Sequence, residues 1–197
     1  MTDAESHYSL FDTPIGHCGF AWTGLGVTRL QLPESNRGAT ERRLRARAEG
    51  ARPQQAPPVP IEQAIADVRR YLAGEQITFA PVALDLREVS GFDRAVYAAA
   101  RSIGWGRTAS YGELAVLAGH PGEAREVGQA LSRNPIAIII PCHRILAKGN
   151  KIGGFSAYGG TLTKEQLLSL ENVDLEGDSP LLPGLLPQRA PWRRAGG

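Results

Sequence analysis

An uninterrupted apolar run between two prolines constrains this chain more than any other stretch of it. Residues 136–140 lie between Pro135 and Pro141, and Cys142 and His143 follow directly. Five apolar residues bounded in this way predict a short buried strand. A cysteine at its end would be held rigidly, half in the core and half facing a cleft, beside a histidine that could take its proton. The alternative is that Cys142 is simply a small core hydrophobe, as free cysteines usually are.

Composition limits the class of protein. The chain has 197 residues, is 42% hydrophobic and can bury the core of one domain or two small ones. No apolar run approaches the roughly 20 residues of a membrane span, and residues 1–6 are too polar for a secretory signal. Cys18 and Cys142 lie far apart in sequence, which favours a reducing, cytoplasmic compartment.

Metal and cofactor binding have little support in the sequence. His7, His17 and Cys18 lie close together but lack the spacing of a metal site, so we expect neither a metal nor a cofactor. The net charge of +2 permits an anionic partner without indicating one.

The first half of the chain predicts an α/β unit, residues 1–89. Turn residues divide residues 7–33 into segments typical of a small antiparallel meander. Residues 39–48 contain four arginines and predict an exposed helix, whose charge is more typical of a solvated face than of a nucleic-acid patch. Apolar residues at helical spacing predict a helix over 61–72, and residues 77–86 predict a strand.

The pattern changes near residues 87–91, where we place a domain boundary. Residues 92–104 have helical spacing. Ser110 and Glu113 then form a capping box, Gly119 ends that helix, and a second helix runs to about Arg133. Two short helices joined by a tight turn are typical of a helix-turn-helix, although a plain pair of packed helices explains the spacing equally well. The overall fold class is therefore α/β, of the α+β kind.

The second helix of this pair has features of a DNA-binding helix. Its small residues, Ala124, Gly128 and Ala130, would let its backbone approach a partner closely, and Arg125 projects from near its start. Small residues with one arginine suit a minor groove or a wedge better than the major groove. The DNA-facing candidates on the two helices are Ser110, Ala124, Arg125, Gly128, Gln129 and Arg133.

The segments Asn134-Pro135 and Pro141-Cys142-His143-Arg144, with the helix pair before them, resemble the O6-alkylguanine-DNA alkyltransferase family of single-use DNA-repair proteins. Matching segments run from about residue 92 to residue 171. The resemblance implies a C-terminal DNA-binding and alkyl-transfer domain over 90–174, after a variable, ribonuclease-H-like domain. Residues 175–197 lie outside the resemblance and have a composition typical of disorder.

The resemblance also implies roles for single residues. Cys142 would accept the alkyl group from O6 of guanine, and from O4 of alkylated thymine. His143 would take the proton of Cys142 through a water, oriented by Glu171. Asn134 would be the hinge before the active-site strand. Tyr111 would crowd the target phosphate and help to protonate the departing guanine, while Arg125 would fill the gap left by the flipped base.

The base pocket is implied in the glycine-rich segment 151–160. Its candidate lining residues, with Tyr111, are Gly154, Phe155, Ser156 and Tyr158. Compared with shorter family members, Ala157-Tyr158 is similar to an insertion, which leaves open whether Phe155 or Tyr158 packs on the base.

Elementary physics supports the role implied for Glu171. Thr163 to Gln166 predicts a second capping box, with Leu162 and Leu167 as a hydrophobic staple. Glu171 lies four residues after Leu167 and so shares the buried face of that helix. A buried carboxylate needs a partner, and an imidazole is a suitable one.

Three other functions fit the sequence less well. A non-catalytic base-flipping sensor of the same fold would have the cysteine replaced, whereas Cys142 is present. A helix-turn-helix regulator explains residues 110–133 but gives no reason for Cys142 and His143. A cysteine hydrolase needs an oxyanion hole and an acyl substrate, to which nothing in the sequence points. The resemblance therefore implies a monomer that binds damaged double-stranded DNA from the minor-groove side and transfers one alkyl group irreversibly.

Overall fold

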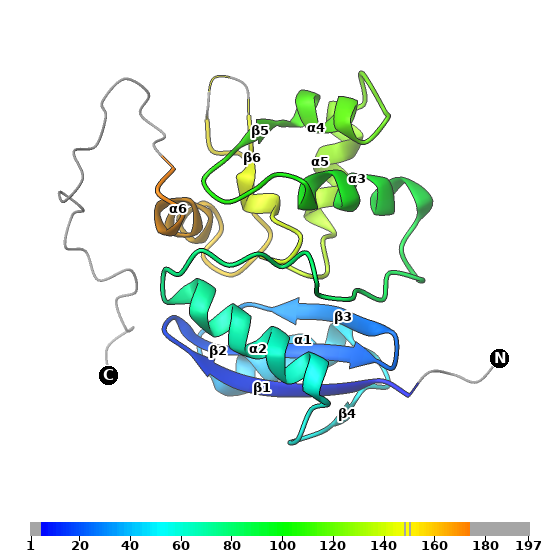
Figure 1. Ribbon diagram of the computed structural model, residues 1–197, viewed down its shortest axis with the longest axis vertical. Helices are drawn as coiled ribbons and strands as arrows, with labels where there is room; N and C mark the ends of the chain where they lie inside the picture. Colours follow the sequence, from blue (N-terminus) through cyan, green and yellow to red (C-terminus); the bar gives the residue numbers. More distant parts are fainter. Residues whose placement is uncertain (1–4, 148, 150, 174–197) are drawn as a thin grey trace.

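The computed structural model describes residues 5–147, 149 and 151–173. A sheet unit formed by the first half of the chain packs against a mainly helical unit formed by the second half (Figure 1). The predicted disordered tail, residues 175–197, lies outside the described residues.

The antiparallel meander predicted for residues 7–33 is confirmed. Strands β1 (His7–Thr13), β2 (Gly16–Thr23) and β3 (Gly26–Gln31) pair antiparallel, and β4 (Arg52–Pro53) adds to β1 in parallel, in the order β3-β2-β1-β4. Successive side chains alternate between the two faces of the sheet. Phe11 and Phe20 therefore enter the main core, whereas Tyr8 and Ala21 form a smaller cluster.

One helix covers each face of this sheet (Figure 1). Helix α1 (Arg37–Arg47) is the predicted arginine-rich helix, and it buries Leu44 against the smaller cluster. The approach is so close that a Cβ on Gly19 would lie 2.6 Å from Cδ2 of Leu44. Helix α2 (Val59–Leu72) covers the other face with the predicted apolar stripe, which lies in the main core.

The strand predicted for residues 77–86 is wrong. Only Leu84 forms an isolated parallel bridge, with Val27 of β3. The Val27 amide donates to the Ala83 carbonyl oxygen at 2.9 Å, and the Asp85 amide donates to the Val27 carbonyl oxygen at 2.9 Å. Pro81 lacks an amide donor and interrupts the run, so regular pairing cannot extend along the segment.

The helices predicted in the second half are confirmed. Helix α3 (Gly91–Arg101) starts after the N-cap Ser90, and α4 (Tyr111–Leu117) starts with the predicted Ser110–Glu113 capping box. Helix α5 (Ala124–Ser132) follows after a short turn and packs against α3 and α4. Strands β5 (Ala109–Ser110) and β6 (Ile145–Leu146) form a small parallel pair.

The strand predicted for residues 136–140 is also wrong, although its burial is correct. The chain turns within the run, because Ile138 has φ 70° and the Ile140 amide donates to the Ile136 carbonyl oxygen at 2.9 Å. A single bridge joins the run to the sheet, where the Leu30 amide donates to the Pro135 carbonyl oxygen at 3.0 Å. Prolines at both ends leave too few donors for a regular ladder. The turn leads directly into the 3-10 helix η1 (Cys142–Arg144).

Helix α6 (Thr161–Leu170) corrects the second predicted capping box. The helix begins two residues before Thr163, after the N-cap Gly160, and Oγ1 of Thr163 donates to the Tyr158 carbonyl oxygen at 2.6 Å. Leu162 is 64% exposed, so it forms no staple with Leu167. Glu171 does share the buried face of this helix, as predicted, and is 1% exposed.

One hydrophobic core joins the two units. It contains Val68 and Tyr71 of α2 together with Val96 of α3, Ile140 and Leu167 of α6. The segment that carries Cys142 is therefore held by the sheet edge on one side and by helices on the other. Among the described residues, no helix is long and apolar enough to cross a bilayer.

Candidate active site

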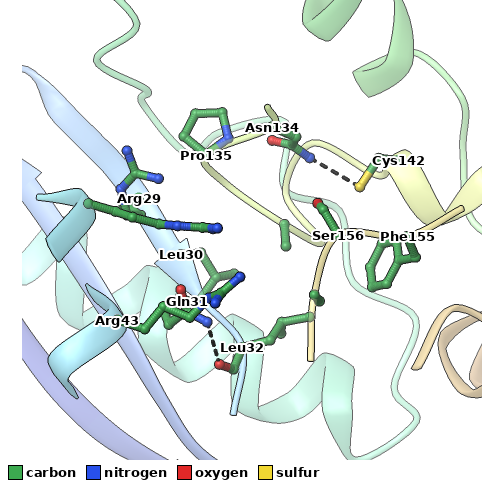
Figure 2. A pocket seen from close by; sticks show the side chains of 13 residues that line it. Arg29, Leu30, Gln31, Leu32, Arg43, Asn134, Pro135, Cys142, Phe155 and Ser156 are labelled. Carbon is green, nitrogen blue, oxygen red and sulfur yellow. Dashed lines mark hydrogen bonds between the residues drawn. The ribbon is translucent and has the colours of Figure 1, made fainter. Parts of the chain in front are cut away.

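Cys142 opens the helix η1 and is 8% exposed. Nδ2 of Asn134 donates to Sγ of Cys142 at 3.2 Å and to the Ile140 carbonyl oxygen at 2.8 Å, and Oδ1 of Asn134 accepts from the Ile136 amide at 2.9 Å. Figure 2 shows the amide of Asn134 pointing at the sulfur. One side chain thus holds both the turn and the thiol, and the hinge role of Asn134 stays a prediction.

The surroundings of Cys142 oppose its ionisation. Burial raises the pKa of the Cys142 thiol, and the hydrogen bond from Asn134 and the positive charge of Lys164 offset that effect only in part. Lys164 is itself fully buried, and its Nζ donates to the Ile145 carbonyl oxygen at 2.5 Å. The resting thiol is therefore protonated at neutral pH, and a base is needed to make it a nucleophile.

His143 follows Cys142 in the same short helix and has the side chain of a possible base. It is fully buried, and its Nε2 lies 2.9 Å from Oε1 of Glu171. Burial lowers the pKa of His143 although Glu171 acts to raise it, so the imidazole is neutral at neutral pH. Among the described residues no side chain or backbone group bonds to its Nδ1. A neutral imidazole with Nε2 bonded to a carboxylate has Nδ1 available to accept a proton.

Glu171 is held from several directions. It accepts hydrogen bonds from Nε and Nη2 of Arg144, both at 2.8 Å, from the hydroxyl of Tyr71 at 2.7 Å and from the Gly106 amide at 3.2 Å. Burial alone would raise the pKa of Glu171, but the bonds from His143 and Arg144 outweigh it and lower the pKa to about 2. Glu171 is consequently a carboxylate that orients the imidazole over the whole physiological pH range.

Cys142 borders a cavity of about 370 Å³, a volume typical of small-molecule sites. Its other lining residues are Tyr111, Gly128, Leu131, Ser132, Gly154, Phe155 and Ser156. Tyr158 is 55% exposed and is not among them, so Phe155 is the aromatic residue of the pair that faces the cavity.

A second, smaller cavity lies between the glycine-rich segment and the sheet (Figure 2). Its volume is about 30 Å³, and Arg29, Arg43, Asn134, Cys142 and Ser156 are among its lining residues. Such a volume holds a water or two. Of the two described cavities that Cys142 lines, the larger one can take a nucleobase.

Tyr111 forms one wall of the larger cavity. A Cβ on Gly153 would lie 2.9 Å from the Tyr111 hydroxyl, and one on Gly128 would lie 3.7 Å from its ring. Gly153 therefore makes room for the tyrosine, whereas a Cβ at position 128 would be in ordinary van der Waals contact with its ring. Burial raises the pKa of Tyr111, and a charge on Cys142 raises it further, so its hydroxyl keeps its proton and can donate.

The comparisons with known proteins agree with this geometry. A family model described as "6-O-methylguanine DNA methyltransferase, DNA binding domain" matches residues 91–173. A methylated-DNA–protein-cysteine methyltransferase of Mycobacterium bovis is 38% identical over 176 residues, which cover 89% of this chain and 98% of the relative. The chain belongs to the methylated-DNA–protein-cysteine methyltransferase family.

Solved structures of methyltransferases share the fold. Mycobacterium tuberculosis OGT in complex with DNA is similar with a TM-score of 0.68 and 38% identity, covering 84% of this chain and 92% of that chain. An O6-methylguanine-DNA methyltransferase from Pyrococcus kodakaraensis has a TM-score of 0.64 at 24% identity over 85% of this chain and 99% of its own, a likeness of fold. The predicted α/β class and the family are thereby confirmed.

In the helix pair of this methyltransferase fold, some of the predicted DNA-facing residues are exposed and others are partly buried. Arg125 and Gln129 are exposed on α5. Ala124 and Gly128 are half-buried, and Ser110 serves as N-cap of α4.

Two expectations about α5 change. Ala130 is fully buried, so it cannot help the helix approach a partner. Arg133 is exposed, but its Nη2 and Nε donate to the carboxylate of Asp93 at 2.9 and 3.1 Å. A contact between Arg133 and DNA would have to compete with that ion pair.

Three residues of the methyltransferase site were missed in the sequence. Tyr71 contacts His143 and Glu171, and Arg144 contacts Glu171. Lys164 donates to the Ile145 carbonyl oxygen, directly after η1, and its charge acts on Cys142. The position of Tyr71 three residues after Val68 indicates burial on the α2 stripe, but it cannot reveal a partner 72 residues away. No group of three or more metal-ligating side chains is found in the part of the chain that the structure describes.

Proposed function

We propose that this protein repairs alkylated DNA by transferring the alkyl group from O6 of guanine to Sγ of Cys142. The observation that carries the proposal is the placement of a cysteine on the wall of a cavity of about 370 Å³, next to a neutral histidine held by Glu171. Membership of the family gives the reaction class, methylated-DNA–protein-cysteine S-methyltransfer.

The proposed chemistry needs few groups. The proton of the Cys142 thiol passes to Nδ1 of His143, directly or through a water, and the thiolate attacks the alkyl carbon. A carbon–sulfur bond forms as the carbon–O6 bond breaks, and the departing guanine receives a proton from Tyr111. Attack at an sp³ carbon requires a thiolate, alignment and a proton for the leaving base, with no oxyanion hole.

The same geometry supports base flipping. A base stacked within a duplex cannot reach a sulfur that is 8% exposed, so the damaged nucleotide has to leave the helix, at a cost of a few kcal/mol. Arg125 is exposed at the start of α5, where it could fill the vacated space. The small residues beside it favour approach from the minor groove.

The proposal also covers turnover, oligomeric state, a second substrate and the cellular compartment. The thioether formed on Cys142 is stable, so each molecule acts once. We expect it to act as a monomer on double-stranded DNA. The same pocket would accept O4-alkylthymine, whose alkyl oxygen has similar chemistry. The free cysteines Cys18 and Cys142 suit a reducing compartment such as the cytoplasm.

Transfer can be tested with a duplex that contains radiolabelled O6-methylguanine, followed by mass spectrometry of the intact protein and its peptides. We expect one added methyl group on Cys142 and no second turnover. Cys142→Ala should bind the duplex with unchanged affinity and take no label. Label on another residue, or repeated turnover, would refute the proposal.

The same experiment separates the alternatives. A base-flipping sensor or a helix-turn-helix regulator would bind the duplex without gaining mass.

Arg125→Ala should lower the transfer rate more than it lowers affinity for undamaged DNA, because Arg125 is proposed to support flipping. An equal loss of affinity for all duplexes would identify Arg125 as a phosphate contact.

A further inference from the structure

A tyrosine from the N-terminal unit lies against the His143–Glu171 pair. Tyr71 belongs to α2 and is fully buried. Its hydroxyl lies 2.7 Å from Oε1 of Glu171 and 3.1 Å from Nε2 of His143. Because that Nε2 and Oε1 are themselves 2.9 Å apart, the three atoms form a closed triangle of hydrogen-bond distances.

Only one placement of protons satisfies this triangle. A carboxylate can only accept hydrogen bonds, so the hydroxyl of Tyr71 donates to Glu171. Nε2 of His143 must then carry a proton, because an unprotonated nitrogen would place its lone pair against a carboxylate oxygen at 2.9 Å. The hydroxyl oxygen of Tyr71 can accept a share of that proton. Nδ1 is therefore the acceptor nitrogen, and it is the ring atom without a protein partner among the described residues.

We propose that Tyr71 is a positioning residue for alkyl transfer, through which the N-terminal unit takes part in the catalytic relay; the inference rests on the function proposed above. Tyr71 gives the imidazole a second anchor at Nε2 and gives Glu171 a further donor. Its own ring is fixed by an edge contact with Trp105 and a tilted contact with Phe79, at centroid distances of 5.4 and 5.6 Å.

Tyr71 orients His143 without adding a charge beside it, as the groups around the imidazole show. Glu171, at the end of α6, favours the imidazolium that forms during transfer, whereas Arg144 of η1 and Lys164 of α6 disfavour it. Cys142 precedes His143 in η1 and becomes neutral once alkylated. Burial and the nearby carboxylate raise the pKa of Tyr71 well above its ordinary value, so α2 contributes a neutral hydroxyl and no charge.

The test is Tyr71→Phe, which keeps the packed ring and removes the hydroxyl. We expect the single-turnover methyl-transfer rate to fall about tenfold, as for a modest misplacement of a reacting group. Affinity for DNA should stay unchanged, because Tyr71 lies on no predicted DNA-facing surface. Tyr8→Phe is the matched control: Tyr8 is 4% exposed and also donates to a carboxylate, Glu41 at 2.8 Å, within the same unit.

A spectroscopic measurement distinguishes positioning from mere support of the fold. Nitrogen-15 NMR of the wild-type protein should show the Nε2-protonated tautomer of His143, with its proton protected from exchange with water. In Tyr71→Phe the same proton should exchange faster, and in Tyr8→Phe it should not change. The wild-type spectrum tests the inference even if the variant were to fold poorly.

The outcomes separate this inference from the function it rests on. A wild-type protein that takes up no methyl group refutes the proposed function. If the wild-type protein is methylated while Tyr71→Phe reacts at the same rate, only the role of Tyr71 is refuted. An Nδ1-protonated His143 in the wild-type protein, or an equal loss of rate in Tyr8→Phe, would also overturn it.

Discussion

The ion pair between Glu171 and Arg144 gives a quantitative prediction for stability. Glu171 is 1% exposed, and its pKa is lowered from 4.5 to about 2 in the folded protein. At about 1.36 kcal/mol for each pKa unit, this difference corresponds to about 3 kcal/mol of folding free energy at pH 7. The loss expected on removing one partner of a buried ion pair, about 3 to 5 kcal/mol, agrees with this value.

We predict that Glu171→Gln lowers the free energy of unfolding by about 3 kcal/mol at pH 7, because the guanidinium of Arg144 stays buried without a counter-charge. The sign of the pH dependence follows from the lowered pKa. The contribution is present above the unfolded pKa of 4.5 and disappears as the pH falls toward 2. The difference between wild-type protein and variant should therefore shrink to about 1 kcal/mol at pH 3.

Urea denaturation of both proteins at pH 7 and pH 3 measures this difference, since titrating groups that do not contact Glu171 cancel in the comparison. Asp85→Asn is the matched control. The pKa of Asp85 is also lowered to about 2, but the Arg87 side chain opposite is 55% exposed. An exposed cation can be solvated by water, so we expect that variant to lose about 1 kcal/mol or less. A loss below about 1 kcal/mol in Glu171→Gln at pH 7, or an equal loss at both pH values, would refute the reasoning.

Three further predictions concern the transfer reaction. Asn134→Ala should slow single-turnover transfer by more than tenfold (about 1.4 kcal/mol), because a buried thiol and a carbonyl lose their shared donor; an unchanged rate would contradict this. Gly153→Ala should slow transfer, because the new Cβ would lie 2.9 Å from the Tyr111 hydroxyl and displace it. The control Gly104→Ala should react normally, because no atom lies within 4 Å of a Cβ added there. Because burial lowers the pKa of His143, the transfer rate should fall only when the pH drops below about 6.5; a pH–rate profile with its acid limb above pH 7 would contradict this.

Local patterns in the sequence were enough to predict the helix starts and the buried residues in much of the C-terminal unit. The Ser110–Glu113 capping box starts α4 as predicted, because a cap involves atoms only a few residues apart. The burial of Glu171 followed from its spacing to Leu167 on one helix face. The Cys142–His143 pair was found in the same way, since its members are adjacent.

Two other local patterns failed, one through a competing local contact and one through a distant part of the chain. The capping box predicted at Thr163 failed for a local reason: the helix begins two residues earlier at Thr161, and the Thr163 hydroxyl donates to the Tyr158 carbonyl oxygen. The apolar run at residues 136–140 has the composition of a strand, but Ile138 turns the chain because the run has only one bridge partner in β3. Apolar composition predicts burial, whereas pairing depends on which edge lies alongside.

By itself, the sequence determined the reactive pair Cys142–His143, the helix pair before it and the family to which the chain belongs. Only the tertiary structure decided how the relay is completed. Tyr71 meets His143 from 72 residues away, and Arg144 pairs with a carboxylate 27 residues away. Such contacts leave no periodic signal in a sequence, because they depend on how α2, η1 and α6 pack around a shared core rather than on the spacing within any one of them.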